Sequence, residues 1–297
     1  MFRFVSTYRQ LMMKQLLSFL LVSIWISLQA SFAQGFFEVS AGGRMAGLGH
    51  AYSAITGDLW TQFSNPAGLA GLEQAALGAS GNQIIGLTQL GSAQLAGGWS
   101  PIKGQGIGGF VHRRGWEAWG ETRAGVSYGI EVLGRLRLGA GADWVQISAA
   151  GYGMTNLLQA NAGMQLDLTR NLAMGVAVQN ATQAGLVDVN GNRQQTLATS
   201  LVGLSYQPSE KVLLTGEAVI QAGFAPLWRT GLEYQVAEIL YVRLGGTVGT
   251  GITPAVSAGA GLYWKQFEFD LATTFGTEIG YSPTLSIAYQ LAGPSSD

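Results

Sequence analysis

The sequence predicts an all-β protein, a transmembrane antiparallel up-and-down β-barrel of about 14 strands, and three observations lead to this prediction. From Ala75 onward, apolar and polar residues alternate with a period of two, as expected of strands with one face in lipid. Charged residues make up only 11% of the chain, whereas Gly, with 44 of 297 residues, is about twice as frequent as usual. After the N-terminus no run of 18 apolar residues occurs, so only a closed barrel would satisfy the backbone hydrogen bonds within a bilayer.

Residues 1–33 have the composition of a signal peptide. Three basic residues precede an apolar run at residues 16–28, and Ser31-Phe32-Ala33 resembles a small-x-small cleavage site. The apolar run is shorter than the roughly 20 residues of a spanning helix, which disfavours a membrane anchor. We therefore expect export to the outer membrane of a Gram-negative bacterium, with outer-membrane lipid around the barrel.

Residues 75–291 are expected to form the barrel, and residues 292–297 a polar tail. Most of the predicted strands reach the roughly 9–11 residues that a tilted strand needs to cross a membrane. With these boundaries, short and long connections alternate, as in barrels with short periplasmic turns and longer external loops. Both ends of the barrel segment should then face the periplasm. The predicted strands are 75–81, 90–100, 105–113, 121–131, 135–148, 155–167, 172–181, 196–206, 211–221, 227–236, 239–248, 254–264, 267–276 and 283–291.

The charged residues fall largely on the polar face of these strands, which would point into the lumen. Isolated buried charges are costly, so we expect pairing across neighbouring strands, above all among Glu217, Arg229, Glu233 and Arg243. Such an interior is either a polar channel or ligand site, or a network that only holds the barrel together. The predicted lumen charge network comprises Arg123, Arg137, Asp143, Glu217, Arg229, Glu233, Arg243 and Asp270.

The sequence offers little for catalysis or for binding a cofactor. It has no Cys and only two distant His residues (His50 and His112), so we expect neither an enzyme nor a metal site. Asp188, Asn190 and Asn192 have the spacing of a weak calcium loop, although a plain turn is the simpler interpretation. The chain has a formal net charge of −1 and no basic cluster, which disfavours nucleic-acid binding.

Residues 34–74 fit neither the signal peptide nor the barrel pattern. They contain a Gly-rich run that begins at Gly43 and the sequence Asn65-Pro66-Ala67-Gly68-Leu69. The run lacks both the preceding strand and the spacing of a dinucleotide-binding loop. Asn before Pro favours a turn, and Ala67 and Gly68 are small enough to pack against a barrel wall. A plug inside the barrel is therefore the better interpretation.

This stretch resembles the N-terminal region of the FadL-like outer-membrane proteins, most of all their PorV/PorQ branch of Bacteroidetes-type bacteria. Members carry a segment like G-x-R-x-x-G-M-G-x-A, then an acidic step, then N-P-A-G-L. In this chain Gly43 and Arg44 are adjacent, Leu48 replaces the usual Met, and Asp58 stands alone where two acids are common. The resemblance is sharp over residues 43–69 and extends further only through the barrel pattern.

The resemblance implies a 14-stranded barrel with residues 34–74 folded inside as a hatch. For the PorV/PorQ branch it implies a non-enzymatic role in type IX protein secretion or envelope assembly, with secretion-system components or cargo proteins as partners. The alternative is a FadL-like channel for the uptake of hydrophobic small molecules, which predicts a continuous apolar pocket between hatch and wall. A second alternative is a structural barrel without transport. The implied hatch motif comprises Asp58, Asn65, Pro66, Ala67 and Gly68.

Overall fold

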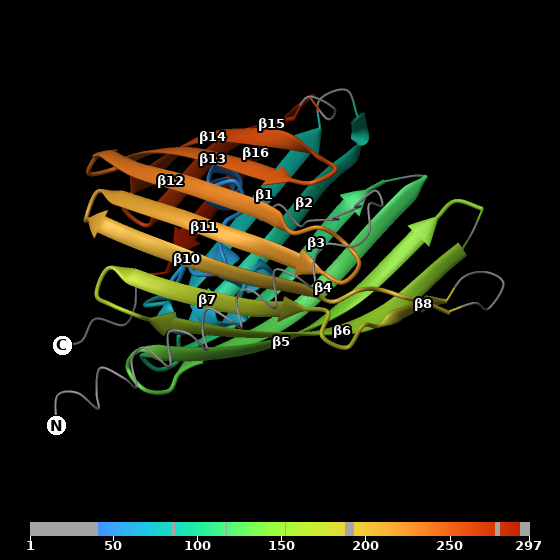
Figure 1. The fold of residues 1–297 in the computed structure, drawn as a ribbon, viewed down its shortest axis with the longest axis horizontal. Coiled ribbons are helices and arrows are strands. Elements are labelled where there is room, and N and C mark those ends of the chain that lie inside the picture. Colours follow the sequence, from blue (N-terminus) through green and yellow to red (C-terminus); the bar gives the residue numbers. More distant parts are fainter. Residues whose placement is uncertain are drawn as a thin grey trace, which may run out of the picture.

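The computed structural model describes residues 41–84, 87–116, 118–151, 153–187, 193–276 and 280–291, and these form a closed 14-stranded antiparallel barrel (Figure 1). The predicted fold class is confirmed. Strand order follows the chain, and the barrel closes where β1 pairs with β16. The barrel strands are β1 (Ala76–Ile84), β2 (Leu87–Trp99), β3 (Gln105–Gly115), β4 (Trp119–Glu131), β5 (Leu136–Ala149), β6 (Gly153–Asp167), β7 (Leu172–Gln179), β10 (Thr199–Ser209), β11 (Val212–Gln221), β12 (Leu227–Ala237), β13 (Leu240–Gly249), β14 (Ile252–Trp264), β15 (Phe267–Gly276) and β16 (Gly280–Gln290).

Several predictions concern parts of the chain outside the described residues. The signal peptide, residues 34–40 of the expected hatch and the polar tail belong to this group, as does the calcium-like turn at Asp188, Asn190 and Asn192. Within the described part of the chain, no helix is both long and apolar enough to cross a membrane.

The ends of the predicted strands differ from those of the barrel strands by at most three residues, but the predicted alternation of short and long links is wrong. Strands β1 and β2 pair up to Ile84 and Leu87, which removes the long link expected at 82–89. Antiparallel strands continue their hydrogen bonding up to the hairpin, so the outer links shrink to a few residues. The link at 180–198 remains long and carries a hairpin of β8 (Gly185–Val187) and β9 (Arg193–Gln195) that the sequence analysis missed.

Alternation along each strand separates a lipid-facing surface from the lumen. On the outer surface, large apolar side chains such as Leu95 (65% exposed) and Leu158 (66%) are exposed. Their neighbours in the strands point inward, where Gln94 and Leu157 are buried. An apolar exterior that encircles the barrel requires lipid rather than water as its solvent.

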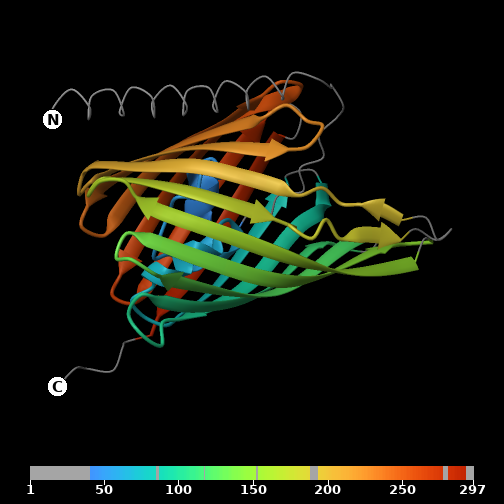
Figure 2. The ribbon, with the colours of Figure 1, turned by 60° about the horizontal axis from the view of Figure 1, so that its bottom comes forward.

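Residues 41–75 lie inside the barrel, and we call them the lumenal segment (Figures 1 and 2). This segment contains α2 (Gly43–Gly47) and the 3₁₀ helices η1 (Leu59–Phe63) and η2 (Pro66–Gly71). Helix α2 packs against β13–β16, whereas η2 packs against β3–β6, so the segment reaches across the lumen.

The local sequence explains where η1 and η2 begin. The Asp58 carboxylate accepts a hydrogen bond from the Trp60 backbone N–H, and the Asn65 side chain accepts one from that of Ala67, so both residues are N-caps. Pro66 follows Asn65 at the first position of η2, where the N–H that proline lacks would have no helical partner.

Glycine gives the wall of the lumen the space that the segment needs. A Cβ at Gly139 of β5 would overlap the backbone of Pro66 and Ala67, and one at Gly175 of β7 would overlap that of Ser53. The backbone of the segment thus rests directly on the backbone of the wall, which accounts for part of the unusual glycine content.

Candidate functional site

The main polar contact between segment and wall is made by Arg44 of α2. Its guanidinium binds both carboxylate oxygens of Glu233 on β12, from Nε to Oε2 at 2.9 Å and from Nη2 to Oε1 at 2.8 Å. The remaining nitrogen, Nη1, lies 2.9 Å from Oδ2 of Asp58 within the segment. Arg44 therefore ties a loop of the segment to the wall through a bidentate pair, the strongest type of charged hydrogen bond.

The chain of charges continues into the wall. Arg243 of β13 has a side chain with no solvent exposure and binds Glu233 (Nε to Oε2, 2.5 Å) and Asp270 of β15 (Nη1 to Oδ1, 2.6 Å). It also donates to the Tyr263 hydroxyl at 2.9 Å. We call this chain the Arg44 cluster, and its members are Asp58, Arg44, Glu233, Arg243 and Asp270.

The segment side of the cluster is completed by Tyr52, whose hydroxyl donates to Oδ2 of Asp58 at 2.7 Å. Burial raises the pKa of Tyr52 well above its ordinary value, and the nearby Asp58 carboxylate raises it further, so the phenol stays protonated as a donor. Burial by itself lowers the pKa of Arg44, but the facing Glu233 carboxylate, together with Tyr52 and Tyr263, outweighs this effect and the net pKa is raised. Arg44 is therefore a permanent cation.

A second polar contact holds the middle of the segment. Glu217 of β11 accepts hydrogen bonds from the backbone N–H groups of Tyr52 (3.2 Å) and Ser53 (2.8 Å) through Oε2. Its other oxygen, Oε1, lies 2.9 Å from Nη1 of Arg229 on β12. Both side chains of this pair are at most 5% exposed, and the pair supplies acceptors to backbone donors that would otherwise be unsatisfied.

Asn65 connects three parts of the molecule. Its Nδ2 donates to the carbonyl oxygens of Ser53 (2.7 Å) and of Met164 on β6 (3.1 Å), while its Oδ1 caps η2. Gln165 of β6 donates to the carbonyls of Ser53 (3.0 Å) and Ile55 (2.6 Å). The other residues of the predicted motif, Pro66, Ala67 and Gly68, are buried within η2.

The predicted lumen network divides into separate groups rather than forming one. Glu233, Arg243 and Asp270 belong to the Arg44 cluster, and Glu217 pairs with Arg229. The remaining three members of the predicted network contact other residues of the barrel wall. Arg137 pairs with Asp167 at 2.7 Å, Arg123 pairs with Glu121 at 3.2 Å, and Asp143 accepts a hydrogen bond from Asn161 at 2.8 Å.

An apolar cluster also joins the segment to the wall, beside the hydrogen bonds that the Gly42 and Gly43 N–H groups donate to Ser80 and Ser286. The buried side chains of Met45, Leu48, Leu59 and Trp60 belong to one hydrophobic cluster that includes Ala76, Ala96, Phe110 and Ala288 of β1, β2, β3 and β16. The rings of Phe63 and Phe110 lie 4.3 Å apart between their centroids. We call this cluster the apolar seam, and it leaves the charged contacts concentrated on β11–β15.

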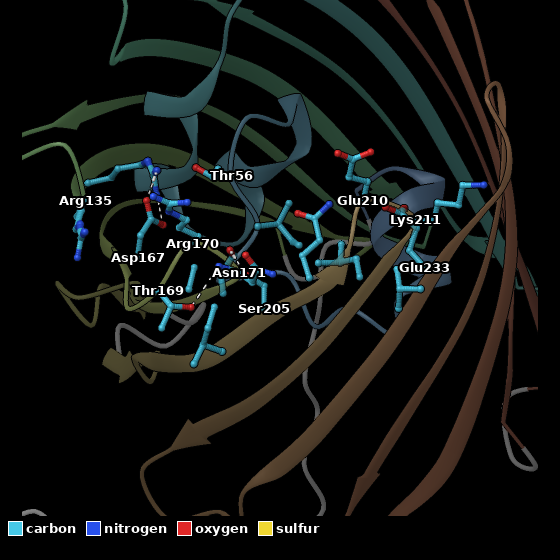
Figure 3. A pocket seen from close by; sticks show the side chains of 18 of the residues that line it. Thr56, Arg135, Asp167, Thr169, Arg170, Asn171, Ser205, Glu210, Lys211 and Glu233 are labelled. Atoms are coloured by element: carbon cyan, nitrogen blue, oxygen red, sulfur yellow. Dashed lines mark hydrogen bonds and ion pairs between the residues drawn. The ribbon is translucent and has the colours of Figure 1, made fainter.

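A cavity of about 640 Å³ lies on one side of the segment, at the end of the barrel where β1 begins and β16 ends (Figure 3). We call this the proximal end. The lumenal segment contributes Arg44, Ala54, Ile55 and Thr56 to the lining. The rest comes from the turns between β4 and β5, β6 and β7, and β10 and β11 and from residues of the barrel strands. A smaller cavity of about 380 Å³ adjoins the other side of Arg44 and Tyr263.

No protein-family model and no curated protein matches this sequence, but solved structures share its fold. One is the CymD monoaromatic hydrocarbon channel (TM-score 0.68, 14% identity, 87% of this chain and 100% of that chain covered). Another is the toluene transporter TodX of Pseudomonas putida (0.65, 13%, 86% and 99%). A third is a FadL homologue of Pseudomonas aeruginosa (0.65, 12%, 87% and 100%).

At these identities the likeness establishes the fold alone. The chain is a closed 14-stranded β-barrel, and its fold is similar to that of the hydrocarbon channel, the toluene transporter and the FadL homologue. The similar structures described above give no support to the PorV/PorQ branch or to type IX secretion, so that link remains a prediction.

Proposed function

We propose that the protein is an outer-membrane channel for hydrophobic small molecules, with the lumenal segment as its gate. The observation that carries the proposal is the position of residues 41–75, which fill the lumen between the Arg44 cluster on one side and the apolar seam on the other. The nature of the similar structures, a monoaromatic hydrocarbon channel and a toluene transporter, supports the class of solute.

The ion pairs between the lumenal segment and the barrel wall suit a segment that moves. A buried ion-pair cluster adds little net stability over an apolar contact, because desolvation offsets much of the Coulomb attraction. The apolar seam is closely packed, and the two cavities that border Arg44 have charged linings, so neither of these two is the continuous apolar pocket expected of a transporter. A solute would therefore pass only after the segment moves.

The lumenal segment contacts the wall through charged groups on β11–β15 and through apolar groups at the apolar seam. This difference supports an apolar rather than a polar solute. If η1 shifts away from β1–β3, the surfaces that become accessible include Trp60, Phe63 and Phe110 of the apolar seam. The charged wall on β11–β15 stays paired through Glu217 with Arg229 and Arg243 with Asp270. The opened route would thus be lined on one side by aromatic and aliphatic groups, which is the usual lining of sites for apolar ligands.

The test is the uptake of toluene by cells that carry the barrel in their outer membrane. We expect faster uptake than in cells with an empty vector, and no change in the uptake of a hydrophilic control such as glucose. Equal toluene uptake in the two strains would contradict the proposal. An equal gain for toluene and glucose would also contradict it, because that result describes a non-selective pore.

A further inference from the structure

The turns around the proximal cavity carry an excess of positive charge. Arg135, Arg170 and Lys211 come from three different turns, and all three are exposed. The backbone places the first two turns side by side, because the Asp167 N–H donates to the Arg135 carbonyl at 2.9 Å. Figure 3 shows Arg135 and Lys211 at opposite sides of the cavity, with Arg170 between them.

These three cations are not neutralised by the cavity itself. Among the described residues, no carboxylate lies within ion-pair distance of Arg135, Arg170 or Lys211. The other two cations of the lining are already paired, Arg137 with Asp167 and Arg44 with Glu233. Glu210 is the one lining carboxylate not included in those pairs, so the open rim is positive and attracts anionic groups from solution.

The lining of the cavity also includes apolar side chains, beside its charged ones. Its lining includes Ala54 and Ile55 of the lumenal segment and Leu172, Val212 and Leu213 of the barrel wall. Its volume of about 640 Å³ falls within the range of roughly 300–1,000 Å³ that is usual for ligand sites. A ligand with both acidic and apolar groups would match the charged and the apolar side chains of the lining together.

The smaller neighbouring cavity has the opposite charge. Asp58, Glu73 and Glu268 line it, with Arg44 as the one Lys or Arg side chain of its lining. The proximal end therefore presents a basic half and an acidic half on the two sides of Arg44 and Tyr263. Charges of both signs, spread over several turns, fit an extended chain in one orientation better than they fit one small anion, which needs donors that converge on a point.

We propose that the proximal cavity is a docking site for an acidic, partly apolar polypeptide segment of a partner protein. The segment would place carboxylates against Arg135, Arg170 and Lys211 and apolar side chains against Ile55 and Leu213. Because Ile55 and Thr56 belong to the lumenal segment, a docked partner touches the proposed gate directly. The docking site does not depend on which solute, if any, crosses the barrel.

The absence of Cys from the sequence allows a direct test. Thr56→Cys places a single thiol on the exposed part of the cavity lining, where an environment-sensitive fluorophore is attached to the detergent-solubilised full chain. The probe is an eight-residue peptide of alternating Glu and Leu. We expect a saturable fluorescence change that weakens with added salt. The double variant R135Q/R170Q should raise the Kd of this peptide at least about tenfold.

The matched control is K103Q/K265Q, which removes the same charge from two proximal turns that do not line the cavity. Its Kd for the Glu-Leu peptide should equal that of the parent. A shift in migration on a denaturing gel between unheated and heated samples should show that both variants are folded. Equal binding of a Lys-Leu peptide, or an unchanged Kd in R135Q/R170Q, would overturn the proposal. So would a full response to millimolar acetate or phosphate, which would identify a simple anion site.

Discussion

Replacing Arg44 with Gln is expected to turn a closed barrel into one that opens frequently to ions. The substitution leaves the carboxylates of Asp58 and Glu233 without the cation that joins them, in a place where both side chains are less than 10% exposed. Removing one partner of a buried pair costs about 3 kcal/mol, at the lower end of the usual range because Arg44 itself is partly exposed. The repulsion between the two carboxylates should push the segment away from β12.

Single-channel recordings in planar bilayers measure this effect. The parent protein should stay closed for most of the trace, and R44Q should show repeated openings at the same voltage. Lys103→Gln removes a cation from an exposed turn and should behave like the parent. Heat-modifiable migration separates opening from misfolding. A folded R44Q barrel that stays closed would show that Arg44 does not hold the segment in place.

Adding a side chain at Gly139 is expected to displace η2 from the wall. A Cβ at this position would overlap the backbone of Pro66 and Ala67, and no flexible side chain is present there that might move aside. Overpacking of this kind costs about 1–3 kcal/mol even when the surroundings relax. Because the barrel wall is fixed by its hydrogen bonds on both sides, the strain should be relieved by movement of the segment.

The measurement for Gly139→Val is the rate at which a maleimide labels Ser64→Cys, the only thiol in such a chain. Ser64 is buried between η1 and η2, so labelling of the parent should be slow and labelling of Gly139→Val at least about tenfold faster. Gly216→Val is the matched control, because a Cβ at Gly216 meets no atom within 4 Å. Equal labelling rates in Gly139→Val and the control would show that close glycine contact does not position η2.

Much of the wall was predictable from the sequence, because a strand has only two faces. The period of two placed Glu217, Arg229, Glu233 and Arg243 on the inner face, and the register makes Glu217 face Arg229 and Glu233 face Arg243. Cross-strand pairing between opposite charges then follows from the cost of leaving either charge alone.

The centre of the candidate site was not predictable in the same way. Arg44 lies in a segment without periodicity, so its partners depend on how that segment folds against the wall. The resemblance drew attention to Arg44 only as part of a motif, and nothing in the pattern connected it with Glu233. The proximal cavity was equally hidden, because its cations come from three turns that are distant in sequence.

Single glycine residues show the same limit of prediction from the sequence. The period of two places Gly139 on the inner face of its strand, where a glycine lets a plug approach closely, but it does not tell which of the inner glycines touch the segment. Only the position of Ser53 and Ala67 inside the barrel distinguishes them.

The central claim, that the lumenal segment is the gate, is tested most directly by locking it to the wall. An ideal Cβ on Gly203 of β10 would lie in contact with Oγ of Ser53, so Ser53→Cys with Gly203→Cys places two thiols next to each other in a chain that otherwise has none. We predict that the oxidised double variant loses toluene uptake, that dithiothreitol restores it, and that neither single variant responds to oxidant. Undiminished uptake through the cross-linked barrel would contradict the account.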